Sequence, residues 1–189
     1  IKAKSEGRLR GAEINFYPPS VGATENVLMA AVLAEGETVI NNAAKEPEVV
    51  DLANCLKKMG ARIEGHGTGR IRVEGVKSLT GCDFNVMPDR VETATYLTAV
   101  TMTGGSIKIK GTRPDSVESV LHKLREAGAV IKSGNDWISL EMKNDRPNST
   151  SLSTGPYPSF PTDMQAQFIA LNSIAKGTAT VTENIFVNR

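Results

Sequence analysis

The sequence predicts an α/β fold made of repeated βαβαββ units. A helix-like apolar stripe, a glycine and then a strand with alternating apolar and polar residues occur in this order three times, around Gly36, Gly104 and Gly177. In the first two copies a second amphipathic helix and a hairpin follow. A unit of this kind has an apolar sheet face that must be covered by its helices and by neighbouring units. We therefore expect an array of such units in the complete protein.

The first helix of each copy is marked by a run of mostly apolar residues: Val27–Ala31, Tyr96–Val100 and Phe168–Leu171. The strands expected after the three glycines are Thr38–Ile40, Ser106–Ile109 and Thr180–Val181. A further strand is expected before each first helix, and in the second copy it follows Cys82. The third copy stops halfway, after its first helix and strand.

The second helices carry apolar residues at i, i+3, i+4 and i+7, as a buried helix face requires: Val49, Leu52, Ala53 and Leu56, then Val117, Val120, Leu121 and Leu124. Pro47 and Pro114 suit the first turn, where a missing N–H has no intrahelical partner. Both helices are expected to end at a Gly-Ala pair, Gly60-Ala61 and Gly128-Ala129. The hairpins expected next are Arg62–Glu64 with Arg70–Glu74, and Val130–Lys132 with Trp137–Leu140.

Charge and composition argue against several classes of partner. The 22 Lys and Arg residues nearly balance the 21 Asp and Glu residues, and a net charge of +1 gives no indication of nucleic-acid binding. The longest apolar run, Val27–Ala34, is far shorter than the roughly 20 residues that cross a bilayer. Residues Ile1–Arg10 have alternating charges and do not resemble a signal peptide. We expect a cytoplasmic protein, and the missing initiator Met and abrupt end predict that both termini are cuts.

The two cysteines and two histidines do not form a recognisable reactive site. Cys55 and Cys82 have no second Cys or His at metal-ligand spacing, so we expect reduced thiols that serve in packing, and no metal site. His66 lies in a glycine-rich turn and His122 lies beside the apolar stripe of a helix. Neither histidine is favoured as a catalytic residue.

Polar residues mark the start of each first helix. Ser20, Asp89 and Thr162 can accept hydrogen bonds from backbone N–H groups of the first turn, and Thr162 with Gln165 would form a capping box. The same geometry can bind a phosphate, because the N–H groups at a helix start attract anions. Ser20-Val21-Gly22 could therefore hold a diphosphate, and Gly22 would allow a close approach.

Asp163 is the carboxylate of greatest interest, because Thr162 beside it can already serve as the cap. Asp163 could then accept a proton from a substrate hydroxyl, or it could simply favour the helix dipole as a solvated first-turn residue. Arg189 follows the last expected strand and could pair with a carboxylate or a phosphate. A terminal arginine would otherwise be ordinary.

Taken together, five motifs resemble the UDP-N-acetylglucosamine 1-carboxyvinyltransferase branch of the enolpyruvyl transferase family. They are Ser20–Thr24, Ala44–Glu48, Met87–Thr93, Phe160–Gln167 and Glu183–Arg189. The string Phe-Pro-Thr-Asp-Met-Gln-Ala-Gln favours this branch over its shikimate-using relative. The resemblance extends over essentially all 189 residues, whereas the family's full chain is more than twice as long.

The resemblance implies the family's inside-out α/β barrel, with six βαβαββ units in two domains that close around the substrates. It implies that residues 1–87 are the C-terminal part of one domain and that residues 88–189 begin the continuing second domain. It further implies transfer of the enolpyruvyl group of phosphoenolpyruvate to the 3-hydroxyl of UDP-N-acetylglucosamine, with release of phosphate, as the first committed step of peptidoglycan synthesis. No cofactor or metal is implied, and the oligomeric state stays open.

Family roles carry over only to matching residues. Asp163 matches the proposed general base; Thr162, Ile185 and Phe186 match contacts to the nucleotide sugar. Ser20, Val21 and Gly22 match the segment around its diphosphate and uridine, and Arg189 matches an arginine on the phosphoenolpyruvate side.

One position departs from the pattern, because Pro18 stands where family members often have a lysine. The mobile loop with its catalytic residue and the other phosphoenolpyruvate-binding groups fall outside these residues, so the chain alone is expected to be inactive. Two alternatives remain: a shikimate enolpyruvyl transferase, and a noncatalytic domain that binds a nucleotide sugar.

Overall fold

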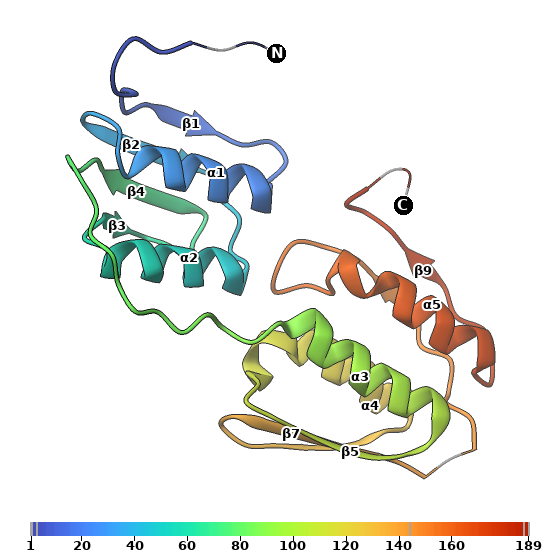
Figure 1. The fold of residues 1–189 in the computed structure, drawn as a ribbon. Helices are drawn as coiled ribbons and strands as arrows, with labels where there is room; N and C mark the ends of the chain where they lie inside the picture. The colour runs from blue at the N-terminus through green and yellow to red at the C-terminus, as the bar shows by residue number, and fades with distance from the viewer. Residues whose placement is uncertain (1, 3, 144, 187, 189) are drawn as a thin grey trace. The chain divides into compact units, whose positions relative to one another are not determined.

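The computed structural model describes residues 2, 4–143, 145–186 and 188. The chain divides into two compact units, Ile1–Met87 and Pro88–Arg189, which are described separately (Figure 1). Each unit combines helices with a sheet, so the predicted α/β class is confirmed.

The first unit has the predicted βαβαββ order. Its elements are β1 (Glu13–Asn15), α1 (Val21–Ala31), β2 (Glu37–Asn41), α2 (Pro47–Lys58), β3 (Arg62–Glu64) and β4 (Arg70–Glu74). The strands form one sheet in the order β1-β2-β4-β3, in which only the β1–β2 pair is parallel. Figure 1 shows α1 and α2 on the same face of this sheet.

Alternation along the strands of the first unit decides which residues enter its core. Ile71 and Val73 of β4 are buried, whereas the flanking Arg70, Arg72 and Glu74 are exposed. The helices contribute Leu28 from α1 and Val49, Ala53 and Leu56 from α2 to the same core. An amphipathic sheet covered by amphipathic helices is therefore the architecture that the apolar periodicity predicted.

The second unit repeats this order without a first strand. Its elements are α3 (Arg90–Thr103), β5 (Gly105–Lys110), the 3₁₀ turn η1 (Pro114–Val117), α4 (Glu118–Glu126), β6 (Val130–Ser133) and β7 (Trp137–Met142). The sheet order is β5-β7-β6, with both pairs antiparallel. Leu97, Leu121, Leu124 and Ile138 are fully buried between the helices and the sheet. The proline-led helix begins as a 3₁₀ turn rather than directly as an α-helix.

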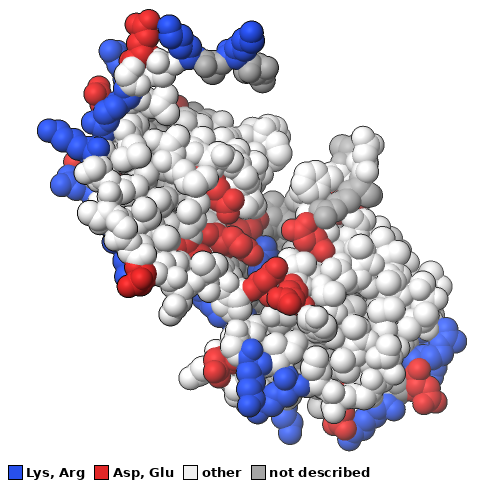
Figure 2. Space-filling model, in the orientation of Figure 1, with Lys and Arg blue, Asp and Glu red and all other residues white. Residues whose placement is uncertain are grey.

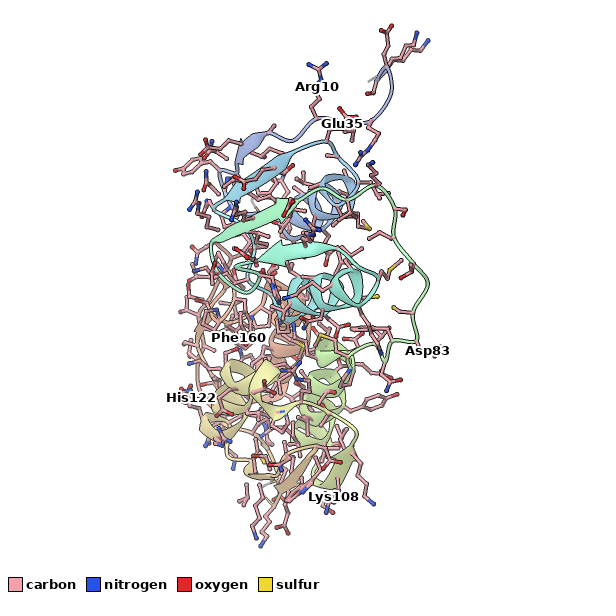
Figure 3. The ribbon with its side chains drawn as sticks, turned by 90° about the vertical axis from the view of Figure 1, so that its left-hand side faces the viewer. Arg10, Glu35, Asp83, Lys108, His122 and Phe160 are labelled. Atoms are coloured by element: carbon pink, nitrogen blue, oxygen red, sulfur yellow. The ribbon has the colours of Figure 1, made fainter. Side chains whose placement is uncertain are left out.

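The expected strand after Cys82 is absent, and this prediction was wrong. The segment instead packs along α2: Thr80 N–H donates to Met59 O at 2.9 Å, Lys58 Nζ reaches Asp83 O, and Met87 N–H donates to Asp51 Oδ2 at 3.3 Å. Figure 3 labels Asp83 on this segment. Some backbone groups of this segment are thus hydrogen-bonded to α2 and its end. Among the described residues, no strand pairs with the segment.

The third copy contributes a helix and a short parallel pair of strands to the second unit. These elements are β8 (Leu152–Ser153), the 3₁₀ turn η2 (Thr162–Met164), α5 (Gln165–Ile174) and β9 (Val181–Thr182). Phe168 and Leu171 of α5 are fully buried in the same core as Leu97 of α3. The half unit is therefore part of the second core rather than an appendage to it.

Candidate functional site

The turn that carries Asp163 is fixed by its apolar neighbours. Met164 is buried in the core of the second unit, and Phe160 meets Phe168 edge to face, with ring centroids 4.9 Å apart. Asp163 itself is exposed on η2. The apolar residues on either side thus hold the backbone in place while the Asp163 side chain stays exposed.

Thr162 does not cap the helix, and this prediction was wrong. Pro161 occupies the cap position of η2, and neither this turn nor α5 has a side-chain cap. The Thr162 hydroxyl instead donates to Glu183 Oε2 at 2.8 Å. Thr162 is the first residue of the turn rather than the residue before it, so its side chain does not stand at the cap position.

Glu183 is the residue that the sequence reasoning missed. Its Oε1 accepts the backbone N–H groups of Ile185 at 2.7 Å and Phe186 at 3.0 Å, while its Oε2 accepts the Thr162 hydroxyl. The two predicted contact segments, at Thr162 and at Ile185-Phe186, are therefore joined by one carboxylate. A signal was present in the sequence. An acidic side chain can accept the backbone N–H groups of the residues two and three positions after it, as capping residues do at helix starts, and Glu183 stands in that position before Ile185 and Phe186.

The hydrogen bonds to Glu183 decide its charge state. Burial alone would raise the pKa of the carboxyl group, but the N–H groups of Phe186 and Ile185 and the hydroxyls of Thr162 and Thr154 together outweigh it and lower the pKa below its ordinary value. The carboxylate is thus ionised at neutral pH. An ionised acceptor makes stronger hydrogen bonds than a neutral one.

The residues after Glu183 are anchored to strand β8 and its extension. Asn184 N–H donates to Thr154 Oγ1 at 2.9 Å, and the Asn184 side chain donates to Ser153 Oγ at 2.7 Å and to Thr154 O at 2.9 Å. Ile185 and Phe186 nevertheless remain 37% and 54% exposed. The loop therefore presents two large apolar side chains from a backbone that is well tied down.

In the first unit, Ser20 caps α1 as predicted. Its Oγ accepts the N–H of Ala23 at 3.3 Å, and Val21 and Gly22 form the first turn of the helix. Gly22 is exposed, and a Cβ added there would meet open space. The N–H groups of a first helical turn have no partners within the helix, so this end of α1 can receive an anion. Pro18 adds no charge there.

Other predicted residues fall outside these two segments. Asp89 caps α3 as predicted, with its Oδ1 accepting the N–H groups of Val91 at 2.7 Å and Glu92 at 3.2 Å. Arg189 lies outside the described residues. His122 lies on the surface of α4, where its ring approaches Glu126 at 3.1 Å (Figure 3).

The remaining histidine and the cysteines show no sign of activation. Burial, with a smaller contribution from Lys57, lowers the pKa of His66, whose Nε2 lies 3.1 Å from Asn54 Oδ1. Burial and the neighbouring Cys82 raise the pKa of Cys55, so its thiol stays protonated at neutral pH. Over the described residues, no group of three or more His, Cys, Asp or Glu side chains is arranged to hold a metal ion.

Two further features bear on what the protein can bind: the charges on its surface and the length of its helices. Each unit carries both basic and acidic side chains on the face drawn in Figure 2. Among the helices described, none has the length and apolar character needed to cross a membrane.

Comparison with known proteins adds family membership to this geometry. The family model described as EPSP synthase (3-phosphoshikimate 1-carboxyvinyltransferase) matches residues 1–189. A UDP-N-acetylglucosamine 1-carboxyvinyltransferase from Shewanella piezotolerans is 60% identical over all 189 residues, and one from Shewanella halifaxensis is 59% identical. The chain spans 45% of the length of each of these relatives.

A solved structure supports the fold independently of close sequence similarity. The enolpyruvyl transferase NikO from Streptomyces tendae superposes with a TM-score of 0.82 at 20% identity, over 97% of this chain and 46% of that one. At this identity the likeness shows the fold alone. The match of the family model along the whole chain shows that the chain belongs to the EPSP synthase family of enolpyruvyl transferases.

Proposed function

We propose that the protein containing this chain transfers the enolpyruvyl group of phosphoenolpyruvate to the 3-hydroxyl of UDP-N-acetylglucosamine. The observation that carries the proposal is the identity of about 60% along the whole chain to proteins named for this reaction. The exposed Asp163, on a turn held by buried neighbours, supplies a carboxylate of the kind that the reaction needs.

In this proposal Asp163 is the general base. It removes the proton of the sugar 3-hydroxyl while the oxygen attacks the phosphate-bearing carbon of phosphoenolpyruvate. A carbon–oxygen bond forms, a proton adds to the neighbouring carbon, and loss of a proton with departure of phosphate then restores the double bond. The proton donor and its loop lie outside these residues.

The other site residues are proposed to bind substrate. Thr162, Ile185 and Phe186 contact the nucleotide sugar, with the exposed apolar side chains of the last two suited to a ring or a methyl group. Ser20, Val21 and Gly22 bind near the diphosphate and uridine through the start of α1. Arg189 serves the phosphoenolpyruvate side.

The cellular setting follows from the same proposal. Transfer to UDP-N-acetylglucosamine would begin peptidoglycan synthesis and place the protein in the cytoplasm, with two small-molecule substrates and no cofactor. We further propose that residues 1–87 and 88–189 belong to two successive domains of the complete protein.

The acceptor assay tests this proposal. Phosphate release by the complete protein is measured with phosphoenolpyruvate and either UDP-N-acetylglucosamine or shikimate 3-phosphate. We expect release that depends on UDP-N-acetylglucosamine and stays at background with shikimate 3-phosphate. Release with the shikimate compound alone would favour the related transferase, and binding of the nucleotide sugar without release would favour a noncatalytic domain.

A further inference from the structure

Glu183 connects two segments of the second unit that are distant in sequence. Its Oε1 accepts the N–H groups of Ile185 and Phe186 at 2.7 and 3.0 Å, and its Oε2 accepts the Thr162 hydroxyl at 2.8 Å. Thr162 directly precedes Asp163 on η2. The carboxylate therefore fixes the loop after β9 against the turn that carries Asp163.

The contacts made by Glu183 differ from those expected of a residue that only stabilises the fold. Glu183 holds the backbone N–H groups of Ile185 and Phe186, whose side chains are 37% and 54% exposed and are not among the buried core residues. Asn184 already ties the same loop to Thr154 and Ser153. The additional bonds to Glu183 thus fix the backbone that presents two partly exposed apolar side chains.

We propose that Glu183 is a positioning residue for the nucleotide sugar, holding Ile185 and Phe186 at a fixed place relative to Asp163. This inference rests on the proposed function. Without the carboxylate, the loop would have to be ordered when the ligand binds, and that cost would appear as weaker binding. Since Glu183 acts through the loop rather than on the reacting atoms, the chemical step should change less than the affinity for the acceptor.

The test is the steady-state kinetics of Glu183→Gln in the complete protein, with UDP-N-acetylglucosamine and phosphoenolpyruvate as substrates. An amide keeps the size of the side chain, but it has one acceptor oxygen and no charge, so it cannot accept hydrogen bonds from the loop N–H groups and the Thr162 hydroxyl together as the carboxylate does. We expect the KM for UDP-N-acetylglucosamine to rise about ten- to hundredfold, with kcat changed by less than about threefold. The KM for phosphoenolpyruvate should stay near its original value.

Glu141→Gln is the matched control, because Glu141 lies on β7 of the same unit and its exposed carboxylate lies 3.6 Å from Lys143 Nζ. This variant should keep all three kinetic constants. Hydrogen exchange gives a second readout without substrate: the Ile185 and Phe186 amides should exchange faster in Glu183→Gln, while the amides of α5 stay protected.

The outcomes are distinguishable. Absence of turnover in the unmodified protein would sink the proposed function, and this inference with it. Turnover in the unmodified protein, with an unchanged KM for UDP-N-acetylglucosamine in folded Glu183→Gln, would overturn the inference alone. If Glu183→Gln does not fold, Glu183→Asp decides: its shorter, charged side chain should raise the same KM about threefold, and no rise would overturn the inference.

Discussion

Asp163 and Thr162 are neighbours in the sequence, yet their side chains have different surroundings. Thr162 is half-buried and donates to Glu183, whereas Asp163 is exposed on the same turn. The structure removes the capping role that the sequence suggested for Thr162. It leaves Asp163 exposed on the turn, where a ligand can reach the carboxylate of the proposed base.

Asp163→Asn tests the proposed base. The amide keeps the size of the side chain but cannot take up a proton at neutral pH, so kcat should fall by about a hundredfold to ten-thousandfold. Because Asp163 is exposed, the free energy of unfolding should change by about 1 kcal/mol or less. Turnover with UDP-N-acetylglucosamine and thermal unfolding of the complete protein measure the two effects.

The control for this variant is Asp136→Asn, which makes the same chemical change on an exposed hairpin residue of the second unit. It should leave kcat unchanged. If Asp163→Asn kept near-normal turnover but unfolded several degrees lower, the residue would be structural and the base would have to be sought elsewhere.

The direction of a hydroxyl's hydrogen bond could not be predicted from the sequence. A Thr before a helix suits a cap, and Gln165 stands where a capping box requires it. Glu183, which accepts the Thr162 hydroxyl, comes from a loop distant in sequence, so no pattern around Thr162 indicates this partner. By contrast, the side chains of Ser20 and Asp89 accept N–H groups from the first turn of the helix that follows each of them, and both caps were predicted correctly.

At the scale of elements, helices α2 and α4 end in the same way. In α2, Gly60 N–H donates to Lys57 O and Ala61 N–H to Leu56 O; in α4, Gly128 and Ala129 make the equivalent bonds. Both glycines have φ of 105°. This is the Schellman pattern, which places a residue with positive φ just after the helix. The Gly-Ala pairs of the sequence predicted both ends because the pattern depends only on local geometry.

Gly60→Ala and Gly128→Ala should each lower the free energy of unfolding by about 1–2 kcal/mol, since a side chain strains a backbone with positive φ. A Cβ at Gly60 would meet nothing within 4 Å, so the loss of stability in Gly60→Ala would come from backbone strain and not from a steric clash. Denaturant unfolding of the complete protein measures the change.

Gly22→Ala serves as the control, because Gly22 lies in the first turn of α1 with open space around an added Cβ. Alanine favours a helix more than glycine does, so stability should be unchanged or slightly higher. An equal loss of stability in Gly22→Ala and Gly60→Ala would contradict the assigned cause.

The expected strand after Cys82 shows where pattern reading fails for an element. A strand exists only where an adjacent strand can pair with its backbone, and that partner is not visible in the local sequence. Here the segment follows α2 instead, and β5 forms an edge of its sheet among the described residues. A hollow lined in part by Tyr96, Ile107 and Ile109 lies beside that edge.

For the molecule as a whole, agreement between the repeated copies made the fold predictable. Thr24 and Thr93 illustrate it: each lies four residues after a capping residue and donates to its backbone oxygen, Ser20 O or Asp89 O. The periodicity and the turn residues that predict such local structure occur in both copies of the unit. The reaction is not encoded in that way, because it depends on a few side chains whose roles came from resemblance rather than from pattern.

Identification of the product is the most direct test of the proposed enolpyruvyl transfer. The complete protein is incubated with UDP-N-acetylglucosamine, shikimate 3-phosphate and phosphoenolpyruvate together, and the products are identified by mass spectrometry and NMR. We predict one new compound, UDP-N-acetylglucosamine with an enolpyruvyl ether on the 3-oxygen of the sugar, formed together with an equal amount of phosphate. An enolpyruvyl group on shikimate 3-phosphate, or an unmodified nucleotide sugar after prolonged incubation, would contradict it.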